Sequence, residues 1–93
     1  MKKKLEEFIE RMIKTGVEVK RKKHYIKFNN VATIISNKKS LKICAIDGFQ
    51  IEDLDLSPIV GKVHIGRFKK CIIVNSENVD AVLGKLENAL LTL

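Results

Sequence analysis

The sequence has no tryptophan, one proline and only two cysteines, and this shortage limits how so short a chain can be stabilised. Small domains usually rely on disulfides, metals or oligomerisation. A zinc site needs four clustered ligands, whereas Cys44, Cys71, His24 and His64 are scattered and form no C-x-x-C pair. The sequence therefore predicts no metal and no cofactor, and leaves oligomerisation as the remedy. Each cysteine lies in an apolar run and is expected to be a small buried hydrophobic residue.

Catalytic motifs are also missing. The chain contains no G-x-S-x-G elbow, no glycine-rich phosphate loop and no H-E-x-x-H. The clustered carboxylates are Asp47, Glu52, Asp53 and Asp55. A metal-dependent nuclease holds several carboxylates around its metal ion. This cluster, with His64 as a partner, is the candidate for such a site in the sequence. Such a cluster before Pro58 is more typical of a solvated turn, so we expect no enzyme and assign no catalytic residue.

Long hydrophobic runs are absent as well. No stretch approaches the 18 or more apolar residues of a membrane span. The lysines at 2–4 are followed by a charged segment instead of the apolar core of a signal peptide. At 93 residues and 45% hydrophobic, the chain is expected to form a single domain over residues 1–93. We expect it to reside in the cytoplasm and to have no membrane partner.

Two segments in which apolar residues recur with the period of a helix flank a segment in which they alternate, as in strands. The first is an amphipathic helix that ends at Gly16, and the apolar residues on its predicted inner face are Leu5, Phe8, Ile9, Met12 and Ile13. The strands are predicted from Val17 into 20–23, and over 24–29, 31–36, 41–46, 62–65 and 71–74. Asn29-Asn30 is expected to form a tight turn because asparagine tolerates positive φ. The sequence therefore predicts an α+β fold: a helix, an antiparallel meander of about five or six strands, and a C-terminal amphipathic helix.

The last helix is expected to begin after a cap at Asn75 or Ser76. Its apolar residues recur at spacings of four and three, the pattern of a heptad seam. They are Val79, Leu83, Leu86, Leu90 and Leu93. Two interpretations remain open, because such a stripe either packs on the sheet or forms a homodimer interface.

Positive charge is the strongest functional indication. The formal net charge is +7, which favours a polyanionic partner. A lysine excess also arises from codon composition in an AT-rich genome, so position matters more than total. The residues expected to contact phosphates are Lys20, Arg21, Lys22, Lys23, Lys27, Lys38, Lys39, Arg67, Lys69 and Lys70. Tyr25 and Phe68 lie among them and are expected to stack on bases, as aromatic side chains do in proteins that bind single strands.

The sequence thus predicts a non-catalytic nucleic-acid-binding protein of low sequence specificity, in which single-stranded DNA or RNA is favoured over duplex. The alternative is a homo-oligomeric protein-interaction module, an accessory protein of viral or archaeal type, whose lysines are only compositional. In both cases we expect a homodimer. Whether the basic segments meet on one face decides between the two interpretations.

Overall fold

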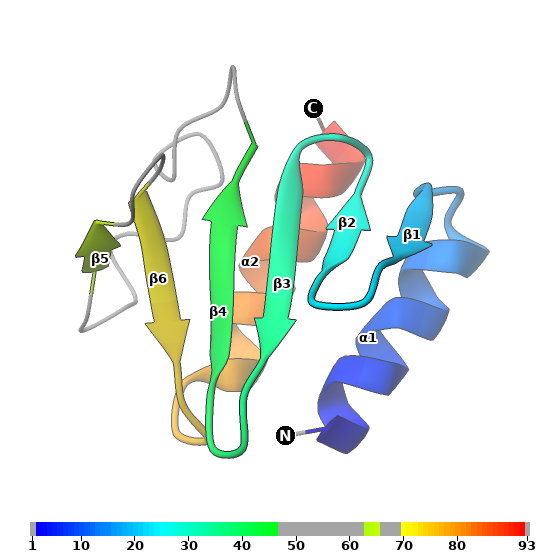
Figure 1. Ribbon diagram of the computed structural model, residues 1–93. Coiled ribbons are helices and arrows are strands. Elements are labelled where there is room, and N and C mark those ends of the chain that lie inside the picture. Colours follow the sequence, from blue (N-terminus) through cyan, green and yellow to red (C-terminus); the bar gives the residue numbers. More distant parts are fainter. Residues whose placement is uncertain (1, 47–62, 66–69, 93) are drawn as a thin grey trace.

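The chain folds as a helix, a meander of antiparallel strands and a second helix (Figure 1). The computed structural model describes residues 2–46, 63–65 and 70–92. Its elements are α1 (Lys2–Lys14), β1 (Val19–Arg21), β2 (Ile26–Phe28), β3 (Ala32–Ser36), β4 (Leu41–Ala45), β5 (Val63–Ile65), β6 (Lys70–Val74) and α2 (Val79–Thr92). All paired strands are antiparallel and lie in the order β1-β2-β3-β4-β6-β5. The predicted α+β fold is confirmed.

Both helices pack on one face of this sheet. Alternate strand residues point to the same side, and those on the helix side are buried: Phe28, Ala32, Ile34, Leu41, Ile43, Ala45, Ile72 and Val74. They form one core with Leu5, Phe8, Ile9 and Met12 of α1 and with six residues of α2. The rings of Phe8 and Phe28 meet edge to face, with centroids 5.4 Å apart. The opposite face of the described strands is covered by neither helix.

The C-terminal end of α1 follows from its sequence. Gly16 adopts a φ of +92°, a conformation that costs glycine little. The amide of Val17 donates to the Met12 carbonyl and the amide of Gly16 donates to the Ile13 carbonyl, the pair of bonds of a Schellman motif. Val17 and Met12 are both buried, which supplies the hydrophobic contact that accompanies this motif.

The predicted inner face of α1 is wrong at one position. Ile13 is 59% exposed, because the apolar stripe ends at Met12 and the helix turns Ile13 away from the sheet. The start of α1 is also unusual. Its first turn holds no acidic residue and begins with lysines, which the positive end of the helix dipole disfavours.

The two helices run parallel to each other, a feature that the meander between them makes possible. Lys4 Nζ lies 2.6 Å from Asp80 Oδ2, and Arg11 Nε lies 3.2 Å from Glu87 Oε1. Both pairs join residues 76 apart in sequence, so α1 and α2 advance in the same direction. Each pair is largely exposed and therefore contributes little to stability, at most about 1 kcal/mol.

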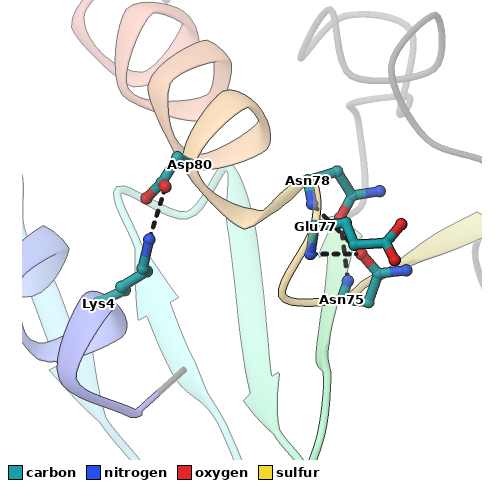
Figure 2. Close-up of polar contacts among 5 residues, drawn as sticks. All are labelled: Lys4, Asn75, Glu77, Asn78 and Asp80. Carbon is teal, nitrogen blue, oxygen red and sulfur yellow. Dashed lines mark hydrogen bonds and ion pairs between the residues drawn. The ribbon is translucent and has the colours of Figure 1, made fainter.

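The turn before α2 is organised by two asparagine side chains (Figure 2). Asn75 Oδ1 accepts hydrogen bonds from the amides of Glu77 and Asn78, at 2.9 and 3.3 Å. Asn78 Oδ1 accepts in turn from the Asn75 amide at 3.0 Å. Asn75 therefore makes the side-chain bonds of an N-cap, as predicted, and Asn78 returns a bond to its amide in the reciprocal arrangement of a capping box. The regular helix α2 begins at Val79, after this capped turn.

The heptad seam of α2 packs on the sheet. Val79, Leu83, Leu86 and Leu90 are all buried in the core of the single chain, together with Val82 and Ala89. Leu93 lies outside the described residues. Of the two interpretations that the sequence left open for this seam, the structure shows the sheet-packing one, and homodimerisation stays a prediction.

Candidate nucleic-acid interface

The sheet face away from the helices carries a row of residues in register. We call this the outer face, and its described residues are Lys20, Lys27, Thr33, Ile35, Lys42, Cys44, Cys71 and Ile73. Lys20 pairs with Lys27 across β1 and β2, and Lys27 pairs with Thr33 across β2 and β3. Thr33 then pairs with Cys44, and Cys44 pairs with Cys71. Cys71 pairs in turn with His64 of β5, so a single row of register positions crosses all six described strands and is basic at the β1–β2 end.

Two lysines lie directly opposite each other in that row. Like charges in a cross-strand pair destabilise a sheet. Lys20 has an exposed ion pair with Glu18, whose Oε1 lies 3.5 Å from its Nζ, whereas Lys27 forms no ion pair with any described residue. The arrangement is one that a bound anion would stabilise.

Tyr25 borders the outer face beside this row. Its side chain is 39% exposed. It lines an open pocket of about 300 Å³ together with Lys27, Thr33, Ile35 and Ile46. The period of two over the predicted strand 24–29 places Tyr25 and Lys27 on the same side, and their common pocket agrees with this. An aromatic ring, an ammonium group and two aliphatic side chains thus surround one space of the size of a small ligand site, which we call the outer pocket.

Four more of the predicted lysines lie in turns at one end of the strands. Lys22 and Lys23 belong to the turn between β1 and β2, and Lys38 and Lys39 belong to the turn between β3 and β4. In an antiparallel meander alternate turns lie at the same end of the strands. Figure 1 shows both turns at the end of the sheet where α1 begins. All four side chains are exposed.

Arg21 differs from the other basic residues of 20–23 because it binds a carboxylate of α1. It lies on the helix face of β1, where Nη1 and Nη2 donate to the two carboxylate oxygens of Glu6 at 3.2 and 2.5 Å. This hydrogen bond, opposed by desolvation, lowers the pKa of Glu6 from its ordinary value of 4.5 and raises the pKa of Arg21. Arg21 therefore joins the sheet to α1, and the structure does not bring it together with Lys20 and Lys27.

The last basic segment of the prediction is mostly outside the described residues. Arg67, Phe68 and Lys69 are not among them, and Lys70 is described only as the first residue of β6, paired with Ile65. The acidic cluster at Asp47, Glu52, Asp53 and Asp55 also lies outside the described part of the chain. Within that part, no group of three His, Cys, Asp or Glu residues is placed to hold a metal ion.

One basic residue escaped the sequence prediction. Lys42 lies on the outer face of β4, between Ile35 of β3 and Ile73 of β6. The available signal was the absence of acidic residues around it. Residues 19–46, which form β1 to β4, contain eight of the 18 Lys and Arg and none of the 11 Asp and Glu. The remainder of the chain is close to neutral, with ten basic and 11 acidic residues.

The cysteines differ from their prediction in one respect. Both are buried, as expected, but they form a disulfide between β4 and β6. Their Cα atoms lie 4.3 Å apart in directly paired positions of the two strands. Strand register, which brings together residues 27 apart in sequence, explains the bond. The disulfide lies in the part of the row far from Lys20, one strand before β5.

Comparison with known proteins gives no further guide to this surface: no protein-family model, no curated protein and no solved structure matches the chain. Neither α1 nor α2 combines the length and the apolar character that crossing a membrane requires.

Proposed function

We propose that the protein binds single-stranded nucleic acid, with low sequence specificity and without catalysis, across the outer face of β1 to β4. The observation that carries this proposal is the separation of charge along the chain. A lysine excess that came from codon composition alone would be scattered. Here residues 19–46 have a net charge of +8 and the rest of the chain has a net charge of −1. The positive charge of the protein therefore belongs to the strands β1 to β4, whose outer face neither described helix covers.

The chemistry of the outer face supports a single strand as the ligand. Proteins that hold single strands combine basic groups that follow the phosphates with aromatic rings on which bases stack. Sheets that bind RNA use the same combination on an open face. Tyr25 offers the ring, and Lys20, Lys27 and Lys42 offer the charge. Ile35 and Ile73 give the face an apolar component that can contact the flat sides of bases.

Duplex DNA fits this surface less well. Reading a major groove usually requires a helix that presents a basic face. The described helices pack on the opposite side of the sheet, and α1 mixes its lysines with Glu6, Glu7 and Glu10. We expect low sequence specificity because the lysines and the one tyrosine of the outer face contact phosphates and the flat faces of bases more than base edges.

The decisive experiment is fluorescence anisotropy of labelled single-stranded and duplex oligonucleotides, titrated at several salt concentrations. Wild-type protein is expected to bind single strands more tightly than duplex. Tyr25→Ala should weaken single-strand binding about tenfold, because one stacked base contributes roughly 1–3 kcal/mol. Lys27→Gln should reduce the log–log salt slope by about 0.7, the value of one lost phosphate contact on a single strand.

Matched controls lie on α1. Ile13→Ala removes an exposed apolar side chain, and Lys14→Gln removes an exposed charge, both in the helix layer. Neither should change affinity or salt slope. An absence of binding at low salt, or equal losses in the control variants, would reject the outer face as the binding surface.

A further inference from the structure

A second pocket lies at the turn between β1 and β2. It has a volume of about 280 Å³ and is lined on its polar side by Arg21, Lys22, Lys23, His24 and Ser36. Ile26 and Ile34, which belong to the helix face of the sheet, form its apolar wall. We call this space the hairpin pocket. Ligand pockets typically measure about 300–1,000 Å³, so its size suits a small group.

The polar groups of the hairpin pocket are donors. Lys22 and Lys23 are exposed and form no ion pair with any described residue. His24 and the Ser36 hydroxyl add two further groups able to donate hydrogen bonds. Among the described residues, the carboxylate in contact with a lining residue is that of Glu6, and it is engaged by Arg21. The charges of Lys22 and Lys23 are therefore not compensated by any carboxylate in the described part of the chain.

The hairpin pocket and the outer pocket share one residue. Tyr25 lines both, so its ring separates a donor-rich space from a space bounded by Lys27, Thr33, Ile35 and Ile46. A nucleotide has the same two parts, a base with flat faces and a phosphate. A base in the outer pocket against Tyr25 would place the phosphate of the same nucleotide beside Lys22 and Lys23.

We propose that the hairpin pocket binds a terminal phosphate of the nucleic-acid strand, so that the protein recognises a phosphorylated strand end. The inference rests on the proposed function and deepens it. A phosphomonoester carries about −1.5 to −2 charges at neutral pH and three acceptor oxygens, whereas a phosphate inside a strand carries one negative charge. Two lysines that form no ion pair within the described ranges match the terminal group better than the internal one.

The test compares three oligonucleotides of one sequence, with a 5′-phosphate, a 3′-phosphate or hydroxyl groups at both ends. One of the phosphorylated strands is expected to bind at least about fivefold to tenfold more tightly than the strand without phosphate. The variant Lys22→Gln/Lys23→Gln should lose this preference and approach the affinity of wild type for the unphosphorylated strand. Both side chains lie exposed in a turn, so the fold is expected to persist.

The matched control is Lys38→Gln/Lys39→Gln, which removes the same charge from the β3–β4 turn at the same end of the sheet but outside the hairpin pocket. It should lower affinity for all three strands equally and keep the preference. Equal affinity of wild type for all three strands overturns the inference while the proposed function stands. Equal loss of preference in both double variants overturns it too.

The two proposals can fail separately. If no oligonucleotide binds, the proposed function fails, and the hairpin pocket is then tested with a nucleoside 5′-monophosphate and with inorganic phosphate by NMR titration. Chemical-shift changes confined to residues 22–25 and Ser36 would support a phosphate site. Unchanged spectra at millimolar phosphate would overturn it.

Discussion

Arg21 and Tyr25 are four residues apart and serve different parts of the molecule. The strand period places Arg21 on the same side as Val19, towards α1, where Glu6 binds it. Tyr25 lies across the turn and borders the outer face. The sequence prediction treated 20–23 as one exposed basic run and so grouped Arg21 with the phosphate contacts. Strict alternation from Val19 would have separated them, because a residue two positions from a core-facing one faces the core as well.

The Arg21–Glu6 pair makes a prediction about pH. The pKa of Glu6 is lowered in the folded protein, chiefly by the hydrogen bond from Arg21. A lowered folded pKa contributes stability that is fully present above the unfolded value, near 4.5, and is lost as pH falls through the folded value. Arg21→Gln should therefore raise the Glu6 midpoint in an NMR titration. Its destabilisation relative to wild type should be present at neutral pH and disappear below the folded pKa of Glu6.

The matched control is Lys14→Gln, which removes an exposed charge from the same helix and leaves the pair of Arg21 with Glu6 in place. It should leave the Glu6 midpoint as it is in wild type. A Glu6 midpoint that does not move on substitution of Arg21 would contradict the ion pair.

At the level of elements, the β2–β3 turn is the one that the sequence predicted most fully. Asn29 and Asn30 have φ values of 50° and 54°, and the Val31 amide donates to the Phe28 carbonyl at 2.9 Å. Two consecutive positive φ angles are the requirement of a type I′ turn, and asparagine meets it better than most residues. Asn29 has a second role, because its Oδ1 accepts a hydrogen bond from the Glu18 amide at 2.8 Å.

The two asparagines should therefore respond differently to substitution. Asn30→Ala is expected to lower the free energy of unfolding by about 1–2 kcal/mol, the cost of a left-handed conformation for an ordinary residue. Asn30→Gly should be nearly neutral, whereas Asn29→Gly should be destabilising because the Glu18 amide loses its partner. Urea denaturation of the three variants measures these differences. Equal effects of glycine at both positions would contradict the separate role of Asn29.

Other element boundaries were less accessible from the sequence. The strands and both helices were predicted because hydrophobic period and turn residues are local signals. The capping role of Asn75 was predicted, but the first residue of the regular helix, Val79, was not, because a capped turn precedes it and local signals do not show where that turn ends. Ile13 was placed inward because it continues the apolar spacing of α1, and the end of the stripe depends on where the sheet stops.

At the scale of the whole molecule, the disulfide is the feature that sequence reasoning missed. Pairing of Cys44 with Cys71 requires β4 and β6 to be neighbours in one particular register. That register is set by tertiary packing and the intervening chain, which spacing does not reveal. The open outer face was equally hidden, since it depends on both helices choosing the same side of the sheet. The concentration of charge in residues 19–46, by contrast, could have been counted directly.

The disulfide should contribute strongly to stability. Crosslinking two cysteines 27 residues apart destabilises the unfolded chain by about 3.5 kcal/mol in the loop-entropy model. The urea midpoint of wild type should therefore fall on addition of a reductant, and the Cys44→Ala/Cys71→Ala protein should be insensitive to it. Identical midpoints with and without reductant would show that the bond is absent in solution. Disulfides persist mainly in oxidising compartments and in the cells of hyperthermophiles, so the cytoplasmic location expected from the sequence stays a prediction.

The parallel course of α1 and α2 has an electrical consequence. The dipoles of antiparallel strands largely cancel, whereas those of two parallel helices add. Their positive ends lie at the end of the sheet that carries the β1–β2 and β3–β4 turns (Figure 1). The lysines in these two turns are Lys22, Lys23, Lys38 and Lys39. Fixed charges and backbone dipoles thus act in the same direction. In the field of a polyanion such a molecule rotates before contact and approaches with this end first, which makes more of its encounters productive.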